Sequence, residues 1–168
     1  VLANLMQRDI RRFGPLRYHE CASSADLCAT SFGCFGPTTT VSTACSGGAM
    51  AIAVAGEMVR DGVADLVIAG GSDSLCRLTV DGFGSLFLLD VDGTKPFDRD
   101  RAGINLGEGA GIVVIESRES AERRGASVLA VLSGWGTSCD AFHATAPESE
   151  GKGAELAMTK ALHAAELQ

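Results

Sequence analysis

Residues 40–70 read "TVSTACSGGAMAIAVAGEMVRDGVADLVIAG", and this stretch decides the predicted fold. It opens within a segment rich in β-branched residues, so a strand is expected at residues 38–43. The small apolar residues at 47–60 predict a buried helix. Residues 64–70 form a continuous apolar run of strand length, which is typical of a strand covered on both faces. This strand, helix, strand succession predicts an α/β fold with layered sheets.

The rest of the chain continues the alternation of helices and strands. Apolar residues at helical spacing predict helices at residues 1–12, 23–32, 78–89 and 150–166, and a short charged helix is expected at 117–124. Apolar runs with β-branched residues predict strands at 110–116 and 128–135. There is no internal repeat and no low-complexity linker, and a chain of 168 residues is ordinarily one domain.

The composition is that of a soluble globular protein, with 46% hydrophobic and 21% charged residues. The formal net charge of −7 argues against general nucleic-acid binding. Arginines nevertheless crowd the start of the chain, at Arg8, Arg11, Arg12 and Arg17. Their spacing fits either a docking patch for an acidic partner or the solvated face of a helix.

No apolar stretch is long enough to span a bilayer, and no signal peptide opens the chain. The six cysteines include no C-x-x-C pair, and several lie in apolar runs where reduced, buried thiols fit. A reducing, cytoplasmic compartment is therefore expected, without a disulfide framework. Because the chain starts without Met inside an apparent helix, we expect it to be an excerpt of a longer protein.

Cys45 is the residue in this stretch that carries chemistry. It lies where the expected strand gives way to the expected helix, and a helix start offers unpaired N–H groups and the positive end of the dipole, which favour a thiolate. The neighbouring Ala44, Gly47 and Gly48 leave room for a substrate carbonyl, and the backbone N–H of Cys45 can meet the oxyanion that develops. A cysteine packed in a core at a helix cap is the alternative.

Five blocks of the sequence, in order, resemble the β-ketoacyl-acyl-carrier-protein synthases. They are "VSTACSGG" at 41–48, "ADLVIAGGSDS" at 64–74, "DGFGSL" at 81–86, "KPFDRDRAGINLGEGAGIVVIES" at 95–117 and "GTSCDAFHATAPE" at 136–148. The resemblance covers essentially the whole chain and is strongest to the elongating enzymes. It implies a thiolase-like layered fold, with residues 1–125 in the N-terminal half that carries the nucleophile and 126–168 opening the C-terminal half.

The same resemblance implies a reaction. The cysteine that matches Cys45 accepts an acyl chain from a carrier protein as a thioester, and malonyl-carrier protein then loses CO₂ and attacks it. No cofactor is implied, because the substrates ride on the phosphopantetheine of the carrier protein. The implied partners are the acyl carrier protein and a second copy in a homodimer. Neither nucleic acid nor a membrane is expected as a partner.

Two histidines complete the family's site, in N-A-H-G-T and K-x-x-x-G-H blocks that this sequence lacks. His143 instead matches a loop beside the pocket entrance, so we do not expect it to be a catalytic base. The 168 residues are therefore expected to carry the nucleophile without its acid/base partners and to be inactive in condensation on their own.

The resemblance places the substrate against Ala44, Phe83, Ile104, Phe142 and His143. Phe83 fits an ordinary core contact equally well. Ile104 replaces a phenylalanine that stands over the reacting centre in relatives. Glu108 is expected to anchor the turn before a strand. No metal site is expected, because Cys139, Asp140 and His143 do not have the spacing of a zinc site.

Two other functions remain open at this stage. A non-catalytic partner of the chain-length-factor kind keeps the fold but usually replaces the active cysteine, which is present here as Cys45. A thiolase or hydroxymethylglutaryl-type synthase acts on CoA esters, and the "TACSGG" and "GEGAG" blocks suit it less well than the carrier-protein enzymes.

Overall fold

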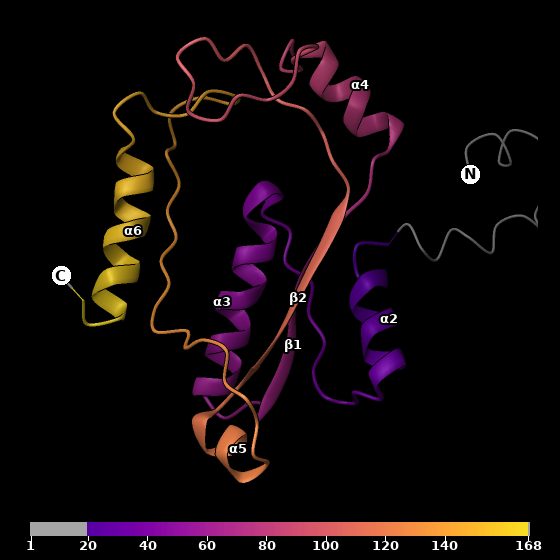
Figure 1. Cartoon of the computed structure of the whole chain (residues 1–168), viewed down its shortest axis with the longest axis vertical. Coiled ribbons are helices and arrows are strands. Elements are labelled where there is room, and N and C mark those ends of the chain that lie inside the picture. The colour runs from indigo at the N-terminus through magenta and orange to yellow at the C-terminus, as the bar shows by residue number, and fades with distance from the viewer. Residues whose placement is uncertain (1–19, 168) are drawn as a thin grey trace, which may run out of the picture. The chain divides into compact units, whose positions relative to one another are not determined.

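The computed structural model describes residues 20–167 (Figure 1). The chain divides into two compact units, one ending at Ile115 and the other beginning at Glu116. The helix predicted at residues 1–12 and the four arginines near the start lie outside the described residues. The predicted boundary at residue 125 concerns the two halves of the family fold and stays a prediction. The two units are described in turn.

The first unit is built on helix α3 (Gly47–Arg60) and strand β1 (Leu66–Asp73). The two elements pack together, and their buried apolar residues are small: Ala53 and Ala55 on the helix and Ala69 on the strand. Small side chains allow the helix backbone to come close to the strand. At Gly71 the two backbones come close, because a Cβ there would lie only 3.2 Å from the Cα of Gly48. Glycine is needed where two backbones meet in this way.

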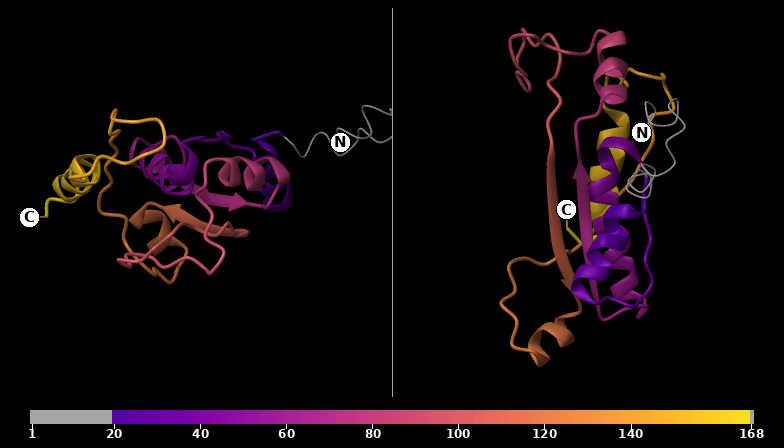
Figure 2. Two further views of the ribbon diagram at one scale, coloured as in Figure 1. Left: turned by 90° about the horizontal axis from the view of Figure 1, so that it is seen from above. Right: turned by 90° about the vertical axis from the view of Figure 1, so that its right-hand side faces the viewer.

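Strand β2 (Gly109–Glu116) pairs with β1 in a two-stranded sheet. The arrows of the two strands point in opposite directions, so the pair is antiparallel (Figure 2). A Cβ on Gly70 would overlap the carbonyl oxygen of Gly111 and lie 2.8 Å from the Cα of Ile112. The sheet therefore has no room for a side chain at Gly70.

Two further helices belong to this unit. Helix α2 (Ser23–Phe32) has the predicted bounds and ends at Gly33, whose φ of 66° is the left-handed conformation that ends many helices. Helix α4 (Arg77–Ser85) begins one residue earlier and stops four residues sooner than predicted. It is capped by Cys76, which has an extended backbone. Helix α3 spans the predicted residues.

Four predictions about the strands and thiols are wrong. No strand forms at residues 38–43 or 128–135, and β1 is covered by few side chains, with Ala69 as its one buried residue. A strand requires a hydrogen-bonded neighbour, and within residues 20–167 only β1 and β2 form a ladder, apart from an isolated bridge between Leu89 and Ile104. The six cysteines are free, and they are exposed except for the half-buried Cys28, so they are not core residues.

The second unit contains helices α5 (Arg118–Arg123) and α6 (Lys152–Ala164). The Ser117 side chain caps α5 by accepting a hydrogen bond from the N–H of Ser120 at 3.1 Å. The segment predicted as a strand runs against α6 through Gly134 and Gly136, where an added Cβ would meet the helix backbone. No helix among residues 20–167 combines the length and apolarity needed to cross a membrane.

Candidate functional site

Cys45 lies in a one-turn 3₁₀ helix, η3 (Ala44–Ser46), that leads directly into α3. Its thiol is exposed. The Ser46 hydroxyl closes the turn by donating a hydrogen bond to the carbonyl oxygen of Thr43 at 2.8 Å. Ala44 has a φ of 51°, a left-handed conformation that costs a residue with a Cβ about 1 kcal/mol. Such strain is found at functional sites, where the surrounding structure holds it.

Cys45 lines a hollow of about 260 Å³ in the first unit. The η3–α3 junction forms one wall, and the end of β1 with the start of β2 forms the other. Its lining residues are Ala44, Cys45, Gly48, Gly71, Ser72, Asp73, Gly109, Ala110 and Gly111. All are small except Asp73, which is also the one charged member. A carbonyl group can thus approach the sulfur without meeting a bulky side chain.

The glycines around Cys45 have a second role besides leaving space. Gly48 meets Gly71 across the packing of α3 on β1, and both line the hollow. The sequence associated the glycines after Cys45 with room for a thioester. The structure adds that Gly48 and Gly71 also set how closely the helix start lies to the strand. The packing of α3 on β1 and the access of a substrate to Cys45 therefore depend on the same two residues.

Sequence reasoning missed the wall opposite Cys45, formed by Ser72, Asp73 and Gly109–Gly111. The available signal was the small and polar "GGSD" that ends β1, together with the glycine-rich start of β2. Glu108 holds these two segments together, because its carboxylate accepts a hydrogen bond from the N–H of Leu75 at 2.8 Å. This contact confirms the anchoring role predicted for Glu108.

A second thiol of the same unit is chemically distinctive. The Cys76 sulfur lies 3.1 Å from the hydroxyl oxygen of Thr79. The Thr79 hydroxyl lowers the pKa of the Cys76 thiol, and the Thr79 backbone N–H acts in the same direction. Cys76 is exposed, so it competes with Cys45 for any thiol reagent.

The structure does not place Phe83 or Ile104 in the lining of the hollow. Phe83 is half-buried on α4. Ile104 forms a parallel bridge with Leu89, in which the Ile104 N–H donates to the Leu88 carbonyl at 2.8 Å. Their proposed contacts with substrate stay predictions.

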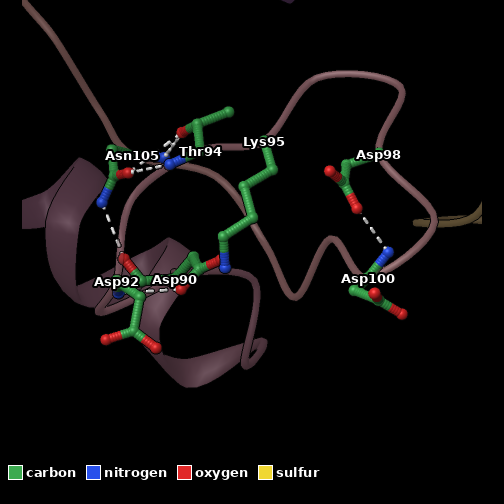
Figure 3. Close-up of polar contacts among 7 residues, drawn as sticks. All are labelled: Asp90, Asp92, Thr94, Lys95, Asp98, Asp100 and Asn105. Atoms are coloured by element: carbon green, nitrogen blue, oxygen red, sulfur yellow. Dashed lines mark hydrogen bonds and ion pairs between the residues drawn. The ribbon is translucent and has the colours of Figure 1, made fainter.

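A polar network fixes the loop that ends at Ile104 (Figure 3). Asn105 joins the two ends of the loop: its Oδ1 accepts from the Thr94 N–H at 2.6 Å, and its Nδ2 donates to the Asp90 carbonyl at 2.7 Å. The buried Asp90 carboxylate accepts from the N–H of Asp92 at 2.9 Å and lies 3.9 Å from the Lys95 ammonium. The loop is thereby closed at its base.

In the second unit, Phe142 and His143 are both exposed. The Nδ1 atom of His143 accepts hydrogen bonds from the backbone N–H groups of Thr145 at 3.1 Å and Ala146 at 3.2 Å. An Nδ1 that accepts carries no proton, so the proton of the neutral ring lies on Nε2. Asp140, from the three residues weighed as metal ligands, accepts from the Glu148 N–H at 3.0 Å. Within residues 20–167 no cluster of three metal-ligating side chains occurs.

Comparison with known proteins identifies the family. The family model described as Beta-ketoacyl synthase, N-terminal domain, matches residues 6–121. The chain belongs to the β-ketoacyl synthase family. This matched range contains Cys45 and every residue that lines the hollow beside it.

Similar proteins extend the match beyond this range. The 3-oxoacyl-[acyl-carrier-protein] synthase 2 of Rhizobium meliloti is 44% identical over 135 residues, which are 76% of this chain and 32% of that protein. A solved type II PKS acyl-carrier protein in complex with its ketosynthase bound to the hexaketide matches with a TM-score of 0.86 and 31% identity, covering 91% of this chain and 40% of that one. The ishigamide ketosynthase/chain length factor matches with a TM-score of 0.84 and 37% identity, covering 89% of this chain and 37% of that one.

These matches confirm the predicted thiolase-like ketosynthase fold, of which this β-ketoacyl synthase chain forms a part. The chain spans about a third of the length of the relatives that it matches.

Proposed function

We propose that this chain carries the acyl-accepting part of a 3-oxoacyl-[acyl-carrier-protein] synthase, with Cys45 as the nucleophile. The observation that carries the proposal is an exposed cysteine at the η3–α3 junction that lines a hollow of small residues, in a member of this family. The hydrogen bond from Ser46 to Thr43 closes the turn that carries Cys45, and Ala44 takes a left-handed conformation within this turn.

The proposed step transfers an acyl group from a thioester on the carrier protein to the thiol of Cys45. The Cys45 thiolate attacks the carbonyl carbon of the acyl group on the carrier protein's phosphopantetheine. The tetrahedral oxyanion is stabilised by backbone N–H groups at the helix start, including that of Cys45. The bond from carbon to the donor sulfur then breaks, and the donor leaves as a thiolate that takes up a proton. The acyl group remains on Sγ of Cys45.

In the whole protein the acyl-Cys45 would be attacked by the enolate that forms when malonyl-carrier protein loses CO₂. The histidine blocks that serve this step in the family are not among these 168 residues. An experiment on this chain therefore measures acyl transfer to Cys45, and we expect no condensation from it.

The other proposed contacts follow the family match. Ala44, Phe83, Ile104, Phe142 and His143 are proposed to contact the acyl chain or its phosphopantetheine arm. With Nδ1 occupied as an acceptor, His143 can offer only an Nε2–H donor in its neutral form, which suits binding and not proton abstraction. The enzyme is proposed to need no cofactor of its own.

An acyl carrier protein is the proposed partner, and a similar ketosynthase has been solved in complex with one. A homodimer acting in the cytoplasm completes the proposal. The second candidate function is a non-catalytic partner, since a similar structure pairs a ketosynthase with a chain length factor. The presence of Cys45 favours the catalytic member of such a pair.

Acyl transfer can be tested directly by mass spectrometry. The chain is incubated with acyl-carrier protein, and the mass gain is located on a cysteine peptide after proteolysis. We expect the acyl group on Cys45, its loss in Cys45→Ser, and its retention in the matched control Cys76→Ser. Acylation of Cys76 with Cys45 left free would reject the proposed nucleophile.

A further inference from the structure

Asp73 gives the hollow beside Cys45 a negative charge. It is the one charged residue among the nine that line it. The Asp73 side chain is held in a turn, because its Oδ1 accepts a hydrogen bond from the Ser74 N–H at 2.9 Å. The N–H of Leu75 donates to Glu108, so the loop that follows Asp73 at the end of β1 is tied to the residue before β2.

No cation offsets this carboxylate within the described part of the chain. The ion pairs among residues 20–167 involve other acidic residues, such as Asp61 with Arg60 and Asp81 with Arg77. Asp73 is exposed and is the one acidic residue that lines the same hollow as Cys45. A reagent or substrate that enters the hollow therefore meets a carboxylate that no cation of residues 20–167 pairs with.

We infer that Asp73 makes Cys45 selective for uncharged acyl groups over acyl groups that carry a carboxylate. This inference rests on the proposed function of Cys45 and adds the charge class of the acyl donor. The physical cause is repulsion between Asp73 and an incoming anion, while a neutral acyl chain has no charge to be repelled. The other lining residues have small, uncharged side chains, so no cationic side chain among them offsets this repulsion.

The size of the effect follows from the size of the hollow. A space of this volume is about 8 Å across if taken as a sphere, and two unit charges at that separation in water repel enough to slow an anion about twofold at ~10 mM ionic strength. At ~0.15 M salt the same repulsion falls to about 1.4-fold. Salt dependence is therefore part of the expected signature.

The test compares iodoacetamide, which is neutral, with iodoacetate, which is anionic. Both reagents attack the same thiolate, so the ratio of their rates at Cys45 cancels the fraction of the thiol that is ionised. Rates are measured on the Cys45 peptide by mass spectrometry, with Cys139 in the second unit as the reference thiol. In Asp73→Asn we expect the preference for iodoacetamide to fall about twofold at ~10 mM ionic strength and less at ~0.15 M.

Two variants serve as controls. Asp73→Glu keeps the charge and should keep the wild-type ratio, which also shows that a change at this position leaves the site intact. Asp61→Asn removes the same charge at the other end of α3 and should leave the ratio unchanged. An unchanged ratio in Asp73→Asn overturns the inference, and so does an equal change in Asp61→Asn, since the effect would then come from net charge.

A thioester pair extends the test to acyl transfer. Butanoyl and succinyl thioesters of N-acetylcysteamine have the same chain length and differ by the carboxylate. We expect butanoyl transfer to Cys45 to be faster, with the gap narrowed in Asp73→Asn. If neither thioester nor the acyl-carrier protein acylates Cys45, the proposed function fails, while the iodoacetamide to iodoacetate ratio still decides the role of Asp73.

Discussion

The substitution Gly70→Ala tests how the sheet beside the candidate site is packed. The added Cβ would overlap the carbonyl oxygen of Gly111 and stand 2.8 Å from the Cα of Ile112. Gly111 lies opposite on β2 and offers a matched control, because a Cβ added there meets nothing within 4 Å and its φ is not left-handed. The two variants add the same methyl group to the same sheet.

The expected magnitude follows from the distance. Two carbon atoms pack best at about 3.5–4.0 Å, so β2 must recede by roughly 1 Å to admit the methyl group of Gly70→Ala. Overpacking of this kind costs about 1–3 kcal/mol, and each ladder hydrogen bond that it strains forfeits up to about 1 kcal/mol. We expect Gly70→Ala to lower the free energy of opening the sheet by about 3 kcal/mol, which raises the equilibrium constant for opening roughly 150-fold. Gly111→Ala should instead be neutral or stabilise by about 0.4–1 kcal/mol, because alanine has fewer unfolded conformations.

Amide hydrogen exchange of the peptides that cover residues 66–73 and 109–116 measures the local opening directly. We expect exchange in both peptides to accelerate by up to roughly 150-fold in Gly70→Ala and to stay the same or slow in Gly111→Ala. Equal behaviour of the two variants would refute the reasoning, because it would mean that the close approach at Gly70 does not limit the sheet.

Three further predictions concern hydrogen bonds of single side chains. Thr79 lowers the pKa of the Cys76 thiol, so Thr79→Val should move the midpoint of the pH-dependent alkylation of Cys76 to higher pH, and an unchanged midpoint contradicts this. Arg124 lowers the pKa of the Glu116 carboxyl. The pair therefore stabilises the segment from Glu116 to Arg124 at a pH above the ordinary carboxyl pKa of about 4.3. This stabilisation is lost as the pH falls through the lower pKa of the folded state. Arg124→Gln should remove that acid dependence from amide exchange in residues 116–126. Asn105→Ala should speed exchange of the Thr94 amide about fivefold, since a hydrogen bond contributes about 1 kcal/mol, and wild-type protection would contradict the closed loop.

The helices could be predicted because their signals are local. Helix α3 has the predicted bounds, since small apolar residues at helical spacing lead to the charged Arg60. Helix α2 ends where predicted because Gly33 takes the left-handed conformation that other residues avoid. Helix α4 stops early at Ser85, and the Phe87 that follows has a positive φ of 56°, which no pattern of apolar residues indicates. Helix ends that depend on backbone conformation thus escape prediction where no glycine marks them.

The strands were harder, because a strand is completed by a neighbour distant in the sequence. Residues 64–70 and 110–116 became β1 and β2, with shifted ends, because each supplies the other's hydrogen bonds. Residues 38–43 and 128–135 have equally suitable β-branched residues, yet no described segment pairs with them. Their propensity reports how well the side chains fit a sheet, and it does not provide the sheet.

The same distinction explains which half of the candidate site the sequence revealed. Cys45, Ala44 and the glycines that follow form one contiguous motif, so their chemistry could be inferred from neighbours in the sequence. Asp73 reaches the same hollow only because β1 packs on α3, and the start of β2 reaches it only because the two strands pair. These residues decide the charge and the width of the space in front of the thiol. The nucleophile can thus be found from local sequence, whereas the choice of substrate that reaches it depends on tertiary contacts. Asp73→Asn tests the second property alone, because it changes the charge of the hollow and leaves the Cys45 motif intact.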